Sequence, residues 1–459
     1  MSNKSLVRSF CEVFTGERIR VAVIGSRRSG KTVFLTSLCS HLYYPDNKKF
    51  NFHEWSVRTE KRHDDERMFR YDDARNLLAH GQWPKPTTDW SSIRIPITLA
   101  KGKKKKLFDL EFLDVPGERV ADFPMIGKDY AEWCKWFDFE FGAKFKDYAE
   151  RLFSCKSKED ALQTYRDFLA NEFADHALSL TPSVVLLDEK GRDLGENGRP
   201  RTVKEAILGV DAEHQFIPLP PSFLKPLKDF DEVERKKWVK EFSVNYSHYK
   251  KWIVAPLAQR IRRTNVLLYL VDVIGLLQRG VDAHFSELKF GEEAIEKFVR
   301  KECRNPVLRA LKRTWDFFLD TKADRFGLIA TQSDRVGGFK NRDNLRGLLS
   351  GMFKQQLGLF PLHEVKTCAS VNTADVHEDD ECKVRAFLTA PESENDKPGV
   401  HVVSKVPTDW PKSSEWKPGD DKYNFPQTFP SFDLRVDVPP KQLDLDYIFW
   451  KIILGLRIN

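Results

Sequence analysis

The chain has 459 residues, of which 41% are hydrophobic, 12% aromatic and 31% charged, and its formal net charge is +7 at pH 7. This composition supplies both a core and a charged surface, so it excludes a globally disordered, collagen-like or low-complexity chain, and the length predicts two or three domains. The small basic excess does not by itself indicate nucleic-acid binding, and we expect no nucleic acid as a partner.

Cysteine usage and apolar runs indicate the compartment. The seven cysteines are scattered, without a C-x-x-C pair or a Cys/His cluster, which argues against a disulfide framework and a structural zinc site. The first residues lack the apolar run of a secretory signal. The longest apolar runs, Asn265–Leu277 and Tyr447–Leu456, are shorter than the roughly 20 residues that span a bilayer. We therefore expect a cytoplasmic protein.

The N-terminal residues predict a strand, a loop and a helix in succession. Residues 19–24 form a short apolar run that indicates a buried strand ending at Gly25. A helical pattern follows from Thr32 to about Tyr44. This order is typical of the first element of a nucleotide-binding α/β fold.

A β-hairpin is predicted next. Strand-like runs, Ile93–Leu99 and Leu107–Val115, flank the lysine-rich turn Lys101–Lys106. We interpret this turn as a solvated hairpin tip, whose charges prevent edge-to-edge pairing; binding to an anionic membrane or nucleic acid is the alternative.

The middle of the chain changes texture. Aromatic-rich helical segments dominate residues 121–263, which we interpret as an inserted helical domain. Strand-like runs resume at Asn265–Val273, Arg325–Thr331 and Val365–Ala369. We therefore expect residues 1–120 and 264–459 to form one discontinuous α/β domain with an elaborated C-terminal region. The apolar run near the C-terminus is interpreted as a helix docked in the core, with a membrane-binding segment as the alternative.

The loop after the first strand carries the strongest motif. Residues 25–32, GSRRSGKT, match the phosphate-binding pattern G-x-x-x-x-G-K-[ST]. The glycines let backbone N–H groups face the β-phosphate, Lys31 places a positive charge against the phosphates, and Thr32 offers a hydroxyl to Mg²⁺. The residues expected to surround the nucleotide here are Ser26, Arg28, Ser29, Gly30, Lys31, Thr32 and Val33.

A second motif follows the hairpin. Asp114, Val115, Pro116 and Gly117 read D-x-x-G, where the aspartate would support Mg²⁺ and the glycine N–H would sense a γ-phosphate. Glu118 stands where a water-orienting glutamine stands in small GTPases, and it is electrostatically a poor substitute. An ordinary strand-end turn is the alternative.

The segment before Ile93 is the candidate for a further Mg²⁺ ligand. It contains Thr87, Thr88, Ser91 and Ser92, of which we favour Thr88. Ser92 is included among the nucleotide-binding residues. Trp90 is expected either to stack on the nucleotide or to pack under the sheet edge.

Two short motifs then indicate a guanine site. Residues 331–334, TQSD, follow an apolar strand and resemble the [NT]-K-x-D element, in which the aspartate accepts hydrogen bonds from guanine N1–H and N2–H₂. Thr331, Gln332 and Asp334 are the residues assigned to the base, and Gln332 replaces the usual lysine. Ala369 and Ser370, from CAS at 368–370, resemble the element whose alanine N–H meets guanine O6. A random polar loop is the alternative.

Arginines near these motifs are candidates for the catalytic charge. Arg28 gives the pattern G-x-x-R-x-G-K-[ST], which resembles that of guanylate-binding-protein and atlastin-like GTPases, where the arginine acts in cis. We favour Arg28 over Arg119 as the group that stabilises the transition state. In the alternative interpretation, both arginines face solvent or bind a partner. Lys31 and Gly117 complete the catalytic set.

The four motifs occur in GTPase order, so the chain resembles P-loop GTPases. The wording of the phosphate loop, the segment Trp83–Trp90 and the long helical insertion make it similar to the YcjX-like family of bacterial stress-associated GTPases. The resemblance implies GTP and GDP binding, a stress-linked role and a YcjF-like membrane protein as partner, through which the protein would reach the inner membrane.

The predicted fold is therefore α/β, a P-loop NTPase of GTPase type with a mostly parallel sheet flanked by helices and a large helical insertion. The predicted activity is Mg²⁺-dependent hydrolysis of GTP to GDP and phosphate by a nucleotide-dependent switch. A non-hydrolysing guanine-nucleotide-binding module and a P-loop ATPase or kinase are the alternatives.

Overall fold

The structure is a computed structural model. It describes residues 17–44, 56–59, 69–85, 90–101, 104–173, 215–224, 232–299, 323–358, 363–377, 380–416, 421–433, 435–436 and 438–455. The chain divides into two compact units. The first contains Met1–Val115, Ile261–His284 and Phe298–Asn459, and the second contains Pro116–Arg260 and Phe285–Lys297. The second unit therefore includes a late segment that the sequence pattern places in the α/β domain.

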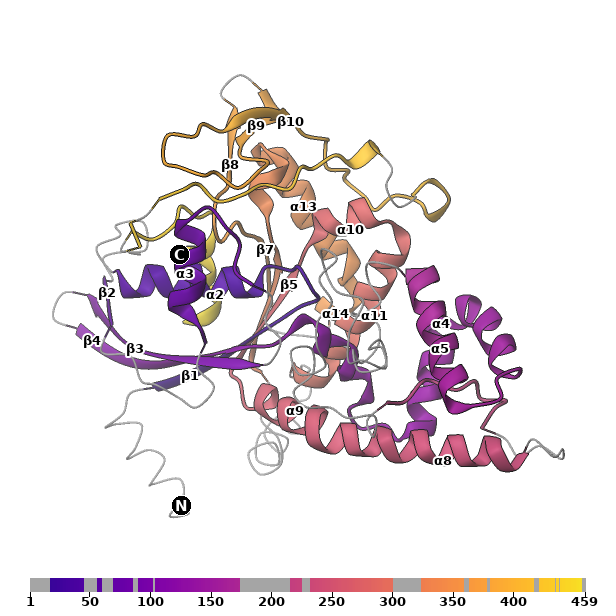
Figure 1. The fold of residues 1–459 in the computed structure, drawn as a ribbon. Helices are drawn as coiled ribbons and strands as arrows, with labels where there is room; N and C mark the ends of the chain where they lie inside the picture. The colour runs from indigo at the N-terminus through magenta and orange to yellow at the C-terminus, as the bar shows by residue number, and fades with distance from the viewer. Residues whose placement is uncertain are drawn as a thin grey trace, which may run out of the picture. The chain divides into compact units, whose positions relative to one another are not determined.

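A seven-stranded sheet forms the centre of the first unit, with the order β2-β3-β4-β1-β5-β6-β7 (Figure 1). Its strands are β1 (Glu17–Ile24), β2 (Ser56–Thr59), β3 (Ser91–Lys101), β4 (Lys104–Asp114), β5 (Val266–Val271), β6 (Arg325–Ala330) and β7 (His363–Thr367). The pairs from β4 through β1, β5 and β6 to β7 are parallel, whereas β2/β3 and β3/β4 are antiparallel. The mostly parallel sheet and the hairpin predicted from the sequence are thus confirmed.

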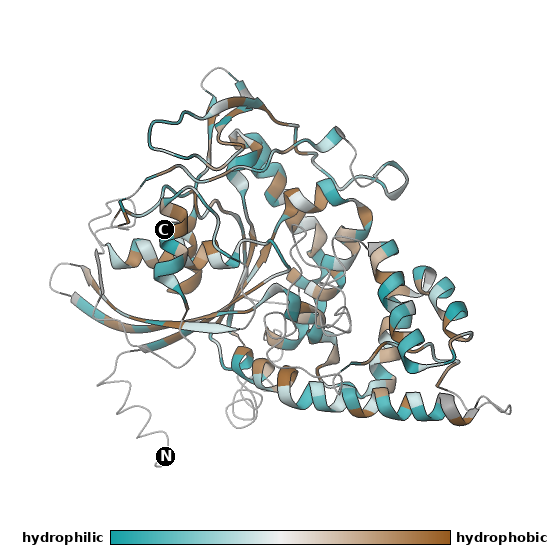
Figure 2. Ribbon diagram, in the orientation of Figure 1, coloured by the Kyte–Doolittle hydropathy of each residue, from teal (hydrophilic) through white to brown (hydrophobic). Residues whose placement is uncertain are grey.

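The pattern of apolar and polar side chains explains the positions of β5 and β4 in the sheet. The sequence of β5, VLLYLV, is buried at every position, as expected of a central parallel strand covered on both faces. In β4, by contrast, apolar and polar residues alternate, and the hairpin of β3 and β4 shows mixed colours in Figure 2. Its Phe108 and Phe112 enter the core, whereas Asp109 accepts a hydrogen bond from Arg18 at 2.9 Å and Glu111 from Arg20 at 3.0 Å. One face of the hairpin is therefore held by ion pairs.

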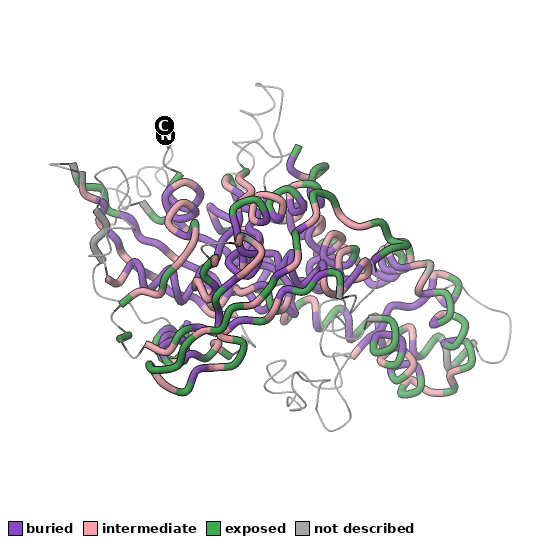
Figure 3. The backbone as a smooth tube through the Cα atoms, turned by 90° about the horizontal axis from the view of Figure 1, so that it is seen from above, coloured by how far each residue is buried: buried purple, intermediate pink, exposed green. Residues whose placement is uncertain are grey.

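Helices cover both faces of the sheet. The helices α2 (Lys31–Tyr43), α3 (Tyr71–Ala79) and the π-helix η10 (Ile448–Ile453) contribute to one core cluster together with β1, β3, β4 and β5. The opposite face carries α10 (Val273–Arg279) and α13 (Phe339–Met352) (Figure 1). In Figure 3 the buried residues are concentrated in the strands and the helices next to them. Trp450 is only 1% exposed, so the C-terminal apolar run is docked in the core as predicted.

The C-terminal region adds a small antiparallel sheet and several short turns. The sheet has the order β10-β9-β8, formed by β8 (Ala374–His377), β9 (Asp380–Ala386) and β10 (Gly399–Val402). The short elements are α14 (Lys354–Leu357), η7 (Ser333–Val336), η8 (Ser413–Glu415), η9 (Asp421–Tyr423) and α15 (Leu445–Tyr447). Much of this region is irregular loop, and backbone hydrogen bonds of Leu443 with Ala369 and of Lys441 with Asn372 join it to the loop after β7.

The second unit is helical. Its elements are η2 (Gly117–Met125), α4 (Tyr130–Leu152), α5 (Lys158–Phe173), α8 (Glu232–Tyr249) and the π-helix η6 (Lys250–Val254), with most of α9 (Ala255–Arg262) and α11 (Val281–Phe298). A capping box of Asp129 and Glu132 begins α4. Aromatic side chains fill the interior, among them Trp133, Phe137, Phe145, Tyr148, Tyr165, Phe216 and Tyr246.

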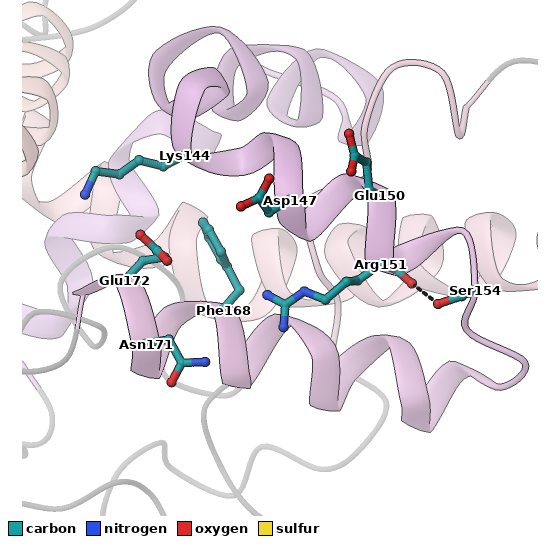
Figure 4. Close-up of a pocket in the computed structure, with 8 residues that line it drawn as sticks. All are labelled: Lys144, Asp147, Glu150, Arg151, Ser154, Phe168, Asn171 and Glu172. Carbon is teal, nitrogen blue, oxygen red and sulfur yellow. Dashed lines mark hydrogen bonds between the residues drawn. The ribbon is translucent and has the colours of Figure 1, made fainter.

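A hollow of about 610 Å³ opens between α4 and α5 (Figure 4). Its lining carries charges of both signs, from Lys144, Asp147, Glu150, Arg151 and Glu172. It has no glycine-rich loop and no concentration of positive charge, so its chemistry does not suit a nucleotide. Over the described residues of both units, no helix combines the length and the apolar character needed to cross a bilayer.

Two buried histidines predict how stability depends on pH. Burial lowers the pKa of His41 on α2 to about 4, with a smaller effect from Arg75, although the ring donates to the Pro440 carbonyl at 3.1 Å. Burial also lowers the pKa of His284 to about 4, where it packs on Trp410 with ring centroids 4.3 Å apart. Below the ordinary value of 6.5 the unfolded chain binds protons that the folded chain does not, so acid destabilises the fold.

We expect the free energy of unfolding to fall by about 2 kcal/mol per histidine between roughly pH 7 and pH 5. His41→Gln keeps a donor for Pro440 but cannot be protonated, so it should flatten this pH dependence in urea titrations. His363→Gln, at an exposed position, is the control. An unchanged slope in His41→Gln would show that folding does not shift the pKa of His41.

Candidate functional site

The phosphate loop curls between β1 and α2 because two glycines take conformations that other residues avoid. Gly25 has φ 149° and Gly30 has φ 78°. A Cβ at Gly25 would lie 2.2 Å from the Leu270 carbonyl oxygen of β5. The loop therefore presses against the neighbouring strand, and the first glycine of the motif is required by close backbone approach as well as by φ.

Lys31 lies buried at the centre of this loop. Its Nζ donates to the Gly25 carbonyl at 2.9 Å, to the Ser26 carbonyl at 2.8 Å and to the Ser29 hydroxyl at 3.3 Å. The helix α2 begins at Lys31, and the N–H of Phe34 donates to the Gly30 carbonyl at 2.8 Å. A buried ammonium and a helix N-terminus thus point to the same place, which is an arrangement suited to phosphate.

Thr32 and Asp114 are adjacent, as the sequence predicts for two Mg²⁺-associated residues. The Thr32 hydroxyl donates to Asp114 Oδ2 at 3.3 Å, and Asp114 is only 1% exposed at the end of β4. Both offer the hard oxygen ligands that Mg²⁺ prefers. Among the described residues, no cluster of three or more His, Cys, Asp or Glu side chains could hold a metal. The Thr32 hydroxyl and the Asp114 carboxylate are a pair of oxygen donors that fits Mg²⁺.

The first residues of β3 lie at the same edge of the sheet. Ser91 is the register partner of Asp114, and the buried Ser92 accepts a hydrogen bond on its carbonyl from the N–H of Phe69 at 2.9 Å. Trp90 is half-buried just before this point. Thr87 and Thr88 lie outside the described residues.

The loop after β6 contacts the phosphate loop directly. Thr331 N–H donates to Val271 O at 3.0 Å, and a Cβ at Gly30 would lie 4.0 Å from Thr331 Cβ. Gln332 Nε2 donates to the carbonyl oxygen of Arg28 at 3.2 Å. The two motifs that would hold the base and the phosphates are therefore joined by a hydrogen bond. The side chain of Arg28 itself is exposed.

Asp334 is buried beside this contact. Its Oδ2 accepts the N–H of Thr373 at 2.6 Å and the Thr373 hydroxyl at 2.8 Å. Burial raises the pKa of Asp334, against the opposing effect of the Thr373 hydrogen bonds. The Thr373 hydroxyl lies in turn 2.6 Å from that of Thr428. A buried carboxylate fixed by these hydrogen bonds is oriented for a ligand that offers further donors.

The loop after β7 differs from the expected arrangement in one contact. The sequence pattern assigns the Ala369 N–H to guanine O6, but this N–H donates to the Leu443 carbonyl at 3.1 Å. Leu443 N–H donates back to Ala369 at 2.8 Å, which makes an antiparallel bridge. The Ser37 hydroxyl donates to the carbonyl of the buried Ser370. The N–H of Ala369 is thus bonded to a carbonyl of the C-terminal region, and no local sequence motif predicts this partner.

Gly117 and Arg119 belong to the helical unit, where they begin η2. The buried guanidinium of Arg119 donates to the Tyr249 hydroxyl at 2.5 Å and to Asp122 at 3.4 Å. Tyr249 also donates to Asp122 at 3.0 Å, while burial raises the pKa of Asp122 to about 6. Arg119 therefore has partners within the helical unit, and its predicted catalytic role stays a prediction.

Four residues at the site have no signature in the sequence. Arg335, Thr373, Thr428 and Leu443 each contact a motif residue or a residue that does. Only Arg335 could have been suspected, since it directly follows Asp334; the others lie on loops that pairing in three dimensions brings to the site.

The strand order, the glycine-rich loop between β1 and α2 and the carboxylate at the end of β4 define a P-loop NTPase fold. Residues 19–455 match the model of the YcjX-like family, DUF463, and the chain belongs to this family.

Two relatives, each named Ras-like GTPase YcjX, are similar to part of the chain. The Escherichia coli (strain K12) protein is 30% identical over 143 residues, which cover 26% of this chain and 29% of the relative. The Shewanella oneidensis protein is 30% identical over 142 residues, which cover 25% of this chain and 29% of the relative. The matched stretch thus spans less than a third of either relative.

The close approach at Gly25 predicts that Gly25→Ala destabilises the fold by about 2–4 kcal/mol, because the new methyl group meets a strand carbonyl and φ is unfavourable. Thermal or urea unfolding measures the change. Gly347→Ala is the matched control, since Gly347 lies exposed on α13 with nothing within 4 Å of an added Cβ. It should be neutral or stabilise by up to about 1 kcal/mol. Equal stability of the two variants would contradict the strain at Gly25.

Proposed function

We propose that this protein binds GTP and GDP and hydrolyses GTP to GDP and phosphate with Mg²⁺. The observation that carries the proposal is the hydrogen bond from Gln332 to Arg28, which joins the loop bearing Asp334 to the phosphate loop. The names of the relatives, both Ras-like GTPases, support it. A nucleotide can then be held by both ends at one edge of the sheet.

The phosphates would be cradled by the backbone of Ser26–Gly30, with Lys31 against the β- and γ-phosphates. Val33 extends this set into the first turn of α2. On binding, phosphate oxygens would replace the loop carbonyls as partners of Lys31 Nζ, so the ammonium would exchange neutral acceptors for charged ones.

The base would lie against the loop Thr331–Asp334. The second oxygen of Asp334 and the free lone pairs of the first would accept N1–H and N2–H₂ of guanine, whereas adenine has no matching pair of donors. The N–H of Ala369 is bonded to the Leu443 carbonyl. We therefore propose that the neighbouring N–H of Ser370 donates to guanine O6.

Mg²⁺, when bound, would neutralise charge on the β- and γ-phosphates. Thr32 would ligate it directly, Asp114 would orient a ligand water, and Thr88 is proposed as the further hydroxyl. Ser92 and Trp90 would flank the nucleotide from the start of β3. Loss of the γ-phosphate would then release the segments near Thr88 and Gly117, which is how a nucleotide switch operates.

From the resemblance to the family alone, we extend the proposal to a cytoplasmic switch in bacterial stress response, with a YcjF-like membrane protein as partner. A non-hydrolysing guanine-nucleotide-binding module is the second candidate, because Glu118 stands in place of a water-orienting glutamine.

Asp334→Asn tests the guanine assignment. The amide presents one acceptor and one donor, so it repels guanine N2–H₂ and suits the 2-oxo group of xanthine, while its oxygen can still accept from Thr373. We expect GDP affinity to fall by about 30–100-fold and the preference to turn toward XDP. Displacement of fluorescent GDP by GDP, XDP or ADP measures this.

Asp343→Asn, a change of a partly exposed aspartate on α13, is the control and should leave the order of affinities unchanged. Equal displacement by ADP and GDP in the unmodified protein would favour the ATPase or kinase interpretation.

Arg28→Asn tests hydrolysis. Asparagine tolerates the left-handed φ of 64° at this position, so the loop is kept while the guanidinium is lost. We expect the single-turnover hydrolysis rate to fall at least about a hundredfold, with GDP affinity within about threefold of the unmodified protein. Arg27→Asn, the neighbouring arginine, is the matched control. An unchanged rate in Arg28→Asn would exclude catalysis by this arginine. The absence of hydrolysis in the unmodified protein as well would favour the non-hydrolysing module.

A further inference from the structure

We propose that Arg335 is a positioning residue of the base site, which orients the side-chain amide of Gln332 so that this glutamine does the work of the lysine it replaces. The inference rests on the proposed function, because it assigns a role within the same guanine-nucleotide site.

Hydrogen bonds to its surroundings fix the orientation of the Arg335 guanidinium. The residue is buried, its Nε donates to the Pro426 carbonyl at 2.8 Å, and its Nη2 donates to the Phe425 carbonyl at 2.8 Å. The remaining nitrogen, Nη1, donates to Gln332 Oε1. Two backbone carbonyls thus hold the fork, and the third bond goes to the side chain that faces the phosphate loop.

This bond decides which end of the amide meets the phosphate loop. A glutamine amide has one accepting and one donating end, and they exchange places when the side chain turns over. With Oε1 held by Arg335, Nε2 is left to donate to Arg28 O at 3.2 Å. A flipped amide would bring Oε1 against that carbonyl, oxygen to oxygen. Arg335 therefore selects the orientation that joins the two loops.

Charge gives the second reason. A lysine at this position would bring a cation to the base and the phosphate loop, which a neutral amide lacks. Arg335 supplies a cation one hydrogen bond away, and a charge-assisted bond polarises the amide so that Nε2 donates more strongly. The acidic groups around Arg335 are Asp334 and Asp272, which compensate its buried charge.

Backbone conformation points to the same contact. Arg28, with φ 64°, and Gln332, with φ 59°, are two of the three non-glycine residues with left-handed φ in the described chain. The third, Asp444, directly follows Leu443, which is bonded to Ala369. Residues with a side chain are disfavoured in this conformation, so the contacts around these residues maintain it.

The segment 425–428 also supports the other half of the base site. Thr373 donates its hydroxyl proton to Asp334, so the 2.6 Å contact requires Thr428 to donate to Thr373. The same short segment therefore positions Gln332 through Arg335 and Asp334 through Thr373. This part of the C-terminal region therefore supports both residues assigned to the base.

Three variants test the role of Arg335 through GDP affinity. Arg335→Met removes the orienting donor and should weaken GDP binding about tenfold. Gln332→Glu keeps an acceptor for Arg335 but has no donor for Arg28, and should weaken binding by a similar factor. In the Arg335→Met background, Gln332→Lys should restore affinity to within about threefold, because lysine donates to Arg28 without an orienting partner.

The rescue separates positioning from general structural support, since a merely destabilised loop would not regain affinity from an added lysine. Gln332→Lys alone should not improve binding, because it places a second cation beside Arg335. Arg346→Met, at an exposed arginine on α13 that pairs with Asp343, is the control for loss of an arginine. Thermal unfolding is measured for each variant.

Failure of this inference is distinguishable from failure of the proposed function. If the unmodified protein binds no guanine nucleotide, the proposed function is wrong and the role of Arg335 is wrong with it. If it binds GDP and Gln332→Glu binds equally well, or lysine gives no rescue, only the positioning role is wrong. Should Arg335→Met fail to fold, weakened GDP binding by a folded Gln332→Glu supports the proposal and unchanged binding overturns it.

Discussion

Parallel pairing of β4, β1, β5, β6 and β7 brings five carboxyl ends to one edge of a single sheet, and the proposed chemistry depends on that constraint. Each strand delivers one short loop to the edge, so a phosphate-binding turn, a carboxylate and a base-binding loop meet although they are far apart in the chain. The contact between Gln332 and the Arg28 carbonyl is the direct evidence that two of these loops touch.

Buried charge is the cost of such a site, and the structure offsets it with hydrogen bonds. Lys31, Asp114, Asp334 and Arg335 are each at most 8% exposed. A buried charge without partners would be strongly destabilising, so each requires a specific set of acceptors or donors. The irregular C-terminal loops supply the carbonyls of Phe425 and Pro426, which accept hydrogen bonds from Arg335.

The helical unit is built differently. Its core is aromatic, and one of its buried polar clusters is formed by Tyr249 with Arg119 and Asp122, which lie directly after the D-x-x-G motif. A change in the conformation of Gly117 would move these side chains first, because Arg119 and Asp122 lie on η2 and Tyr249 is hydrogen-bonded to both.

The sequence alone determined the elements whose chemistry is local. The glycines, lysine and threonine of residues 25–32 carry their own geometric requirements, and the apolar runs with their flanking turns predict the parallel sheet and the hairpin. Only the tertiary structure decided that Arg335 holds Gln332, that Leu443 occupies the Ala369 amide and that Thr428 supports Thr373. These contacts join loops distant in the chain, and backbone carbonyls, which every residue carries, leave no mark in a sequence.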